Sequence, residues 1–159
     1  MNRNRSIYRT IKSVLFTTAA LCFVATAGYA QTGTGETKGV SQQQLNPELV
    51  NIEGTVEKVE SGPCKYTTGK SVSGTHLFVR TQDKLINVHL GPTSEISKLL
   101  SAKEGDLLAM IVFRTDRLPE DQYIAKEVTI NGEGIVLRDD TLKPVWSGRY
   151  SKAKWRIGS

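Results

Sequence analysis

The sequence predicts an all-β protein, a small five- to six-stranded OB-like barrel with one short helix between strands three and four. Two observations support this fold. Short segments with apolar residues at every second position recur through residues 50–138, as expected of half-buried strands. One segment with helical spacing interrupts them after the third strand. A helix at that place is the layout of the OB-fold. A small sandwich or roll is the alternative.

The first predicted strand contains Val50, Ile52, Gly54 and Val56 in alternation, whereas Val59 has the opposite parity. This break of phase predicts a bulge or a strong bend near residues 54–58, as the first strand of a small barrel needs. A loop rich in Gly, Ser and Thr follows at 61–74. Two strands are expected next, at 75–81 and 84–90, with a short turn at 82–83.

Pro92 opens the predicted helix, with Thr93 or Ser94 as N-cap and Gly105 as the candidate C-cap. Ile96, Leu99 and Leu100 give it an apolar stripe at helical spacing. Strands are expected at 107–114 and 123–130. The dipeptide 131–132 is Asn-Gly, the strongest short hairpin signal, and it leads to a strand at 135–138.

The first thirty residues have the order of a secretory signal peptide. Arg3, Arg5, Arg9 and Lys12 form a basic head, an apolar run follows at 14–24, and small residues precede the cleavage sites after Ala27 and Ala30. We therefore expect export to a periplasmic or secreted location, with cleavage after Ala30 favoured. An uncleaved membrane anchor is the less favoured alternative, because the stretch 13–30 has only 18 residues, at the lower bound for a spanning helix, and contains many Thr and Ala residues.

The domain organisation expected from composition has four parts. Residues 1–30 are the signal peptide, 31–47 a flexible leader rich in Gly, Thr and Gln, 48–147 the OB-like domain, and 148–159 a basic aromatic tail. The chain has 21 Lys and Arg against 16 Asp and Glu. Four of these basic residues lie in the signal, which leaves 17 against 16. The high isoelectric point therefore gives no reason to expect a nucleic-acid ligand.

Several short motifs are similar to those of a known family. They are Thr75-His76-Leu77, Val88-His89-Leu90-Gly91-Pro92, Ala125-Lys126-Glu127-Val128, and Leu137-Arg138-Asp139-Asp140 followed by Pro144-Val145-Trp146. In this order they resemble a family of small secreted bacterial OB-like domains, most of them uncharacterised. The resemblance covers residues 50–147 and implies fold and compartment, but no catalytic residues. The turn at 81–84 departs from the family pattern because it lacks a glycine.

The two histidines of the chain are predicted to face each other. With an even turn at 82–83, Leu77 pairs with Val88 and Val79 with Ile86, which makes these four the core face. His76 then lies opposite His89 on the other face. Directly opposed residues have Cβ atoms about 4.5–5.5 Å apart, which lets two imidazoles share a metal ion.

That face is also where OB-folds commonly bind ligands. Phe78, Arg80 and Asn87 would add an aromatic ring, a guanidinium and an amide to His76 and His89 as a ligand-binding set. Cys64, in the preceding loop, could join the histidines as a soft site for Zn²⁺ or copper. The spacing matches no standard ligand motif, however, so the alternative is a chance pairing with no cofactor at all.

The tail interleaves aromatic and basic residues. Arg149, Lys152, Lys154, Trp155 and Arg156 could lie at an anionic membrane surface. The alternative is that Trp146 closes the core and the remainder is a solvated extension. Export argues against nucleic acid as a natural partner.

No enzyme signature is present, since the chain has neither a nucleophile motif, a phosphate-binding glycine loop nor a zinc-protease motif. The carboxylate pairs 120–121 and 139–140 are interpreted as turn residues. Arg138 is expected on the surface or in a cross-strand ion pair.

Three functional hypotheses remain. The first is a non-catalytic periplasmic module that binds a peptide, a glycan or a small anionic ligand. The second is a periplasmic metal-binding protein that uses His76, His89 and Cys64. The third is an envelope scaffold held by the basic tail.

Overall fold

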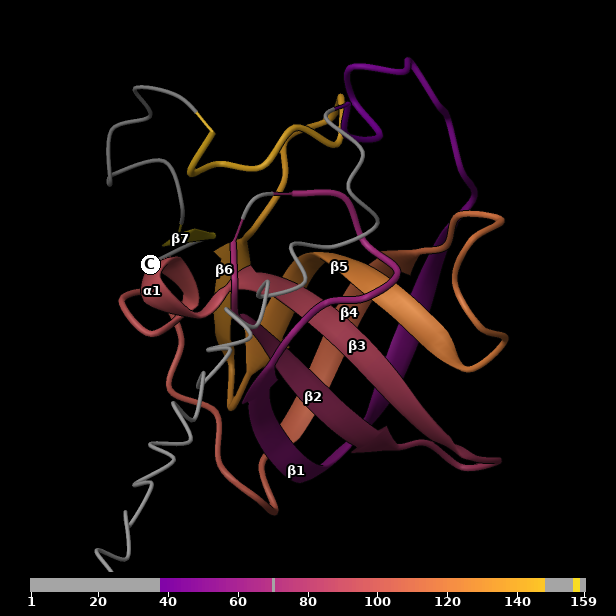
Figure 1. The fold of residues 1–159 in the computed structure, drawn as a ribbon. Coiled ribbons are helices and arrows are strands. Elements are labelled where there is room, and N and C mark those ends of the chain that lie inside the picture. Colours follow the sequence, from indigo (N-terminus) through magenta and orange to yellow (C-terminus); the bar gives the residue numbers. More distant parts are fainter. Residues whose placement is uncertain (1–37, 70, 148–155, 158–159) are drawn as a thin grey trace, which may run out of the picture.

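A closed ring of strands forms the body of the protein (Figure 1). The computed structural model describes residues 38–69, 71–147 and 156–157, so the predicted signal peptide, part of the predicted leader and most of the predicted tail lie outside it. The elements in chain order are β1 (Leu49–Gly62), β2 (Gly74–Arg80), β3 (Leu85–Pro92), α1 (Thr93–Ile96), β4 (Leu107–Phe113), β5 (Gln122–Ile130), β6 (Glu133–Val136) and β7 (Arg156–Ile157).

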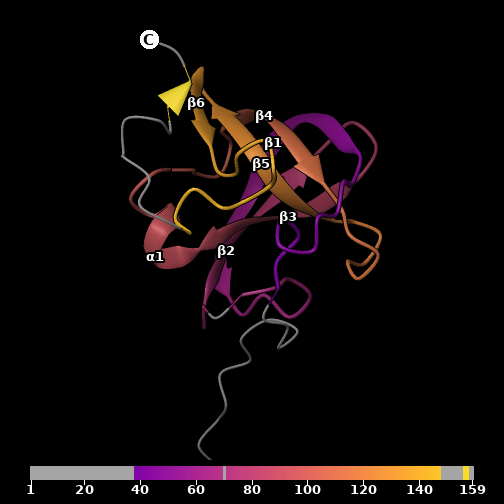
Figure 2. The same cartoon turned by 90° about the horizontal axis from the view of Figure 1, so that it is seen from above.

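The ring closes through a parallel pairing between β3 and β5. The sheet order is β3-β2-β1-β4-β5-β6-β7, and the additional β3–β5 contact joins its two sides. Asn87, Val88 and His89 there pair with Gln122, Tyr123 and Ile124. The helix α1 lies between β3 and β4 at one end of the ring, as Figure 2 shows from above. This arrangement confirms the predicted all-β, OB-like fold.

The long first strand is shared between two neighbours. Its first half pairs with β4 and its second half with β2, and the register shifts between Val56 and Lys58. The predicted bulge is therefore confirmed. Gly54 is required just before it, because a Cβ there would lie 2.5 Å from the carbonyl oxygen of Arg80. Close backbone approach of this kind is a common reason for glycine in a strand.

The β2–β3 hairpin has the register that an even turn predicts. Leu77 pairs with Val88 and Val79 with Ile86, and all four side chains are at most 1% exposed inside the ring. His76 pairs with His89 on the opposite face. The core prediction and the histidine pairing are both confirmed.

The helix is shorter than its apolar stripe suggests. It spans four residues, its N-cap is Pro92, and no side chain caps it. The Thr93 hydroxyl instead contacts the hydroxyls of Ser73 and Thr75. The predicted caps were therefore wrong: Ser97 is the C-cap, and Gly105 lies in the turn before β4 with a φ of +87°. Ile96 is nevertheless buried, and Leu99 and Leu100 pack against the core.

The Asn131-Gly132 turn connects β5 and β6 as predicted, and both residues have positive φ. The alternation then breaks just after β6. The amides of Leu137 and Arg138 both donate to the carbonyl oxygen of Lys126. Two consecutive residues facing one partner form a bulge, which changes the side to which the following side chain points.

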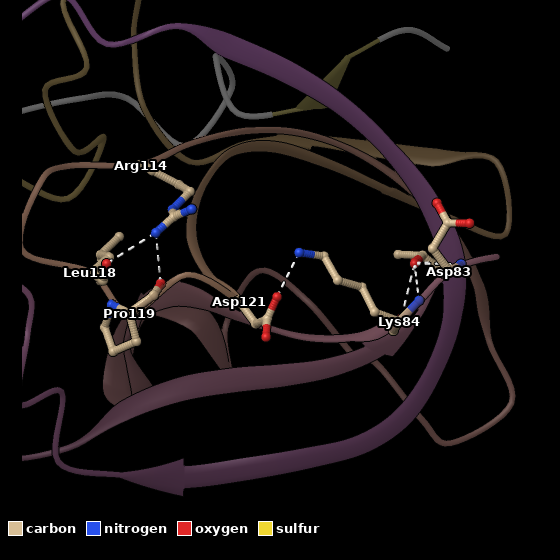
Figure 3. Close-up of polar contacts among 7 residues, drawn as sticks. Asp83, Lys84, Arg114, Leu118, Pro119 and Asp121 are labelled. Carbon is tan, nitrogen blue, oxygen red and sulfur yellow. Dashed lines mark hydrogen bonds and ion pairs between the residues drawn. The ribbon is translucent and has the colours of Figure 1, made fainter.

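Polar contacts hold the outer loops in place (Figure 3). Lys84 forms an ion pair with Asp121 at 2.5 Å, and Arg114 donates to the carbonyl oxygens of Leu118 and Pro119. Asp139 accepts bonds from the amides of Thr141 and Lys143. These contacts agree with the interpretation of the carboxylate pairs as turn residues.

The segment before β1 and the end of the chain both add to the body. Val40 packs against a second apolar cluster that contains Phe113, Leu118, Ile124 and Leu142. Trp146 packs against the main core, and β7 pairs with β6. Over the ranges that the structure describes, no helix combines the length and the apolar character needed to span a membrane.

Candidate metal centre

Cys64, His76 and His89 meet on the face of the β2–β3 hairpin that points away from the core. One ligand atom from each residue lies within 4.8 Å of the other two. Cys64 Sγ is 3.3 Å from His76 Nε2. The two imidazole centroids are 4.4 Å apart, with an angle of 62° between the ring planes. A thiol and two imidazoles at this spacing can hold one metal ion.

Each residue is placed by a different feature of the fold. The cross-strand register sets the two histidines opposite each other. The loop between β1 and β2, magenta in Figure 1, contains Cys64, whose sulfur lies 3.3 Å from His76 Nε2. Gly74 makes room for the sulfur, because a Cβ at this position would lie 2.1 Å from Cys64 Sγ.

Outer amide groups fix the tautomer of both rings. His76 Nδ1 lies 3.3 Å from Asn87 Oδ1, and His89 Nε2 lies 2.9 Å from Gln122 Oε1. An amide oxygen only accepts, so these two ring nitrogens carry the protons. The lone pairs of the neutral rings are therefore on His76 Nε2 and His89 Nδ1. A histidine that donates its outer N–H to a polar group is the usual arrangement of a metal ligand.

His89 Nδ1 is buried and has no hydrogen-bond partner among the described residues. A buried polar atom without a partner is costly, so such an atom calls for an explanation. Burial also lowers the pKa of His89 to about 4, with smaller contributions from His76 and Arg138. The ring is therefore neutral at neutral pH, which is the form that binds metal.

The thiol of Cys64 is half-buried, and this burial raises its pKa. The positive charge of Arg138 acts in the opposite direction. A metal ion would displace the thiol proton, as in other thiolate sites.

Arg138 is not the surface residue that the sequence predicted. It is buried, and its Nη1 donates to the carbonyl oxygens of Leu90 and Ala125. Its guanidinium carbon lies 5.4 Å from the centre of the Trp146 ring and 5.9 Å from that of Phe113. The prediction failed because the rings of Phe113 and Trp146 cover the guanidinium, and strand alternation does not show such a cover.

The predicted ligand-binding set is only partly assembled. Asn87 contacts His76, as described above. Arg80 is exposed and forms an ion pair with Glu57 at 2.9 Å. Phe78 lies under the ammonium of Lys58, 5.6 Å from the ring centre. Neither Phe78 nor Arg80 lines the cavity described next.

A cavity of about 640 Å³ adjoins the three-residue cluster. Cys64 and His89 line it together with Arg138 and Trp146. Its other walls come from the turn at 39–45, the β1–β2 loop and the segment 142–147. This volume is typical of small-molecule sites. A metal ion held by the cluster would therefore have an open side.

Two features of this site could hardly be predicted from the sequence. Gln122 reaches His89 only because β5 closes the ring against β3, a contact between segments 33 residues apart. The neighbourhood of Arg138 depends on Phe113 and Trp146, which come from other segments of the chain. The Pro144-Val145-Trp146 motif, by contrast, did mark a segment that packs on the core.

Comparisons with known proteins identify the family. The family model for the MamS/MamX magnetosome protein family matches residues 48–135, which is more than half of the chain. This stretch contains β1 to β5 and all three residues of the cluster. No curated protein and no solved structure gives a significant match. On the family match, the chain belongs to the MamS/MamX magnetosome protein family.

Proposed function

We propose that this protein is an exported, non-catalytic metal-binding protein that holds Zn²⁺ or a copper ion through Cys64, His76 and His89. The observation that carries the proposal is the meeting of three ligand atoms within 4.8 Å of one another, with an amide oxygen on the far side of each imidazole ring. His89 Nδ1 in particular has no other described partner. A metal ion would give this atom the partner that it lacks.

The chemistry of the ligands favours soft or borderline metals. One thiolate and two imidazoles are typical ligands of Zn²⁺ and copper, whereas Mg²⁺ and Ca²⁺ prefer oxygen. Three protein ligands leave one position of a tetrahedral site for water or for a molecule in the cavity.

The proposal includes the compartment in which the protein acts. The pattern of residues 1–30 is that of a secretory signal, and the family name refers to the magnetosome. Both support a location in the periplasm or in another compartment of the cell envelope that a membrane encloses. A thiolate site there would be protected from oxidation by its bound metal.

Metal titration of the purified mature protein tests the proposal. We expect one Zn²⁺ or copper ion per chain, with no binding of Mg²⁺. His76→Ala, His89→Ala and Cys64→Ala should each lower affinity at least a hundredfold, and the double histidine variant should lose little more than either single one. That pattern is expected when the residues serve one ion.

Two further kinds of variant sharpen this experiment. Asn87→Leu and Gln122→Leu should weaken binding about 10–100-fold, since they remove only the groups that orient the rings. Arg80→Gln, on the same hairpin but outside the cluster, is the matched control and should bind as the wild type does. Wild-type protein that binds no transition metal, or histidine variants that bind normally, would refute the function.

A further inference from the structure

Three basic residues, Arg138, Arg117 and Lys143, are among the described residues that line the cavity beside the cluster, and no Asp or Glu is among them. Its walls also carry apolar surface from Phe113, Ile124, Leu142 and Trp146, which the same lining includes. A ligand that suits such a cavity has a negatively charged head and an apolar body.

The charge of Arg138 is the centre of this argument. The side chain is 9% exposed, so its guanidinium has lost most of its water. Buried charges in proteins are nearly always paired with an opposite charge. Among the described residues, however, no carboxylate contacts Arg138, and only Nη1 donates hydrogen bonds. The donors on Nε and Nη2 have no described partner.

These free donors form the edge of the guanidinium fork that binds a carboxylate with two parallel hydrogen bonds. The rings of Trp146 and Phe113 lie within 6 Å of the guanidinium and restrict its position. Gly91 leaves space for the Trp146 ring, since a Cβ there would lie 2.3 Å from it. The fork is therefore held in place before any ligand arrives, which lowers the entropic cost of binding.

The geometry points to a binding site in this cavity for a small organic carboxylate, held by Arg138 at the charged end and by Trp146 and its apolar neighbours along the body. Inorganic anions fill only a small part of 640 Å³ and leave the apolar walls without contact. The site does not depend on metal, because Arg138 is not a member of the cluster. Of the predicted ligand-binding set, His89 lines this cavity, whereas Phe78, Arg80, Asn87 and His76 do not.

A matched pair of probes tests the charge requirement on the metal-free wild-type protein. 2-Naphthoate and 2-naphthylmethanol share one apolar body and differ in the carboxylate. We expect naphthoate to bind with one site per chain, at least tenfold more tightly than the alcohol, in calorimetric titration. Equal affinities, or no binding of naphthoate at millimolar concentration, would overturn the proposal.

Two measurements locate the site. In the wild type, naphthoate should shift the Nε–H resonance of Arg138 and the indole N–H resonance of Trp146 in NMR spectra. Arg138→Gln should lower the affinity for naphthoate to that of the alcohol, whereas Arg80→Gln should leave it unchanged. If Arg138→Gln does not fold, the resonance shifts decide: naphthoate binding that leaves both signals in place would contradict the proposed site.

Discussion

Lowering the pH from 6.5 to 4 is expected to remove about 3 kcal/mol from the free energy of unfolding of the metal-free protein, through His89 alone. Burial lowers the pKa of His89 to about 4 in the folded state, whereas the unfolded chain takes up the proton near 6.5. Between these two values the unfolded state binds more protons. Stability therefore falls as the pH falls through this window, and the contribution of His89 is constant below it.

Urea unfolding at intervals from pH 4 to pH 7.5 measures this effect. Carboxylates also change the free energy of unfolding as they titrate, so the comparison with His89→Gln isolates the histidine. In this variant the free energy of unfolding should fall less between pH 6.5 and pH 4, because the contribution of His89 is absent. Parallel stability curves for the two proteins would show that His89 is protonated as easily in the folded state as in the unfolded chain.

Replacing Trp146 by Ala is expected to destabilise the protein by about 3 kcal/mol. The ring packs on the main core, covers Gly91 and lies 5.4 Å from the guanidinium carbon of Arg138. Its removal leaves a void beside the core and takes an aromatic face away from the Arg138 guanidinium. Trp146→Phe should recover part of the loss, because it restores an aromatic face for Arg138.

Thermal and chemical unfolding of these variants give the measurement, with deletion of residues 148–159 as the control. The deletion removes the two-residue pairing of β7 with β6, a contact at the edge of the sheet, and should cost less than 1 kcal/mol. A deletion that costs as much as Trp146→Ala would show that the tail is an integral part of the fold.

The parts of the fold that depend on local pattern were predictable from the sequence. The change of parity between Val56 and Val59 marked the bulge in β1, and Asn131-Gly132 marked the β5–β6 turn. Alternation and an even turn fixed the pairing of His76 with His89. Each of these features involves residues close together in the chain, where strand period and turn chemistry determine the geometry.

The surroundings of the histidines were less predictable because distant segments provide them. Cys64 was included only as a candidate, since the path of a long loop has no period. Gln122 reaches His89 through closure of the ring, and Arg138 is buried because Phe113 and Trp146 cover it. Strand alternation placed His76 and His89 on the face opposite the core, yet they are only 8% and 4% exposed. The β1–β2 loop and the segment 138–147 cover that face, and strand alternation cannot show such a cover.

X-ray absorption at the zinc edge of the Zn²⁺-loaded protein tests the metal centre most directly. The account predicts one sulfur at about 2.3 Å and two imidazole nitrogens at about 2.0–2.1 Å, with one lighter atom in the remaining position. Cys64→Ala should remove the sulfur and keep the imidazole scattering. A spectrum with only oxygen ligands, or one without sulfur in the wild type, would contradict a centre built from Cys64, His76 and His89.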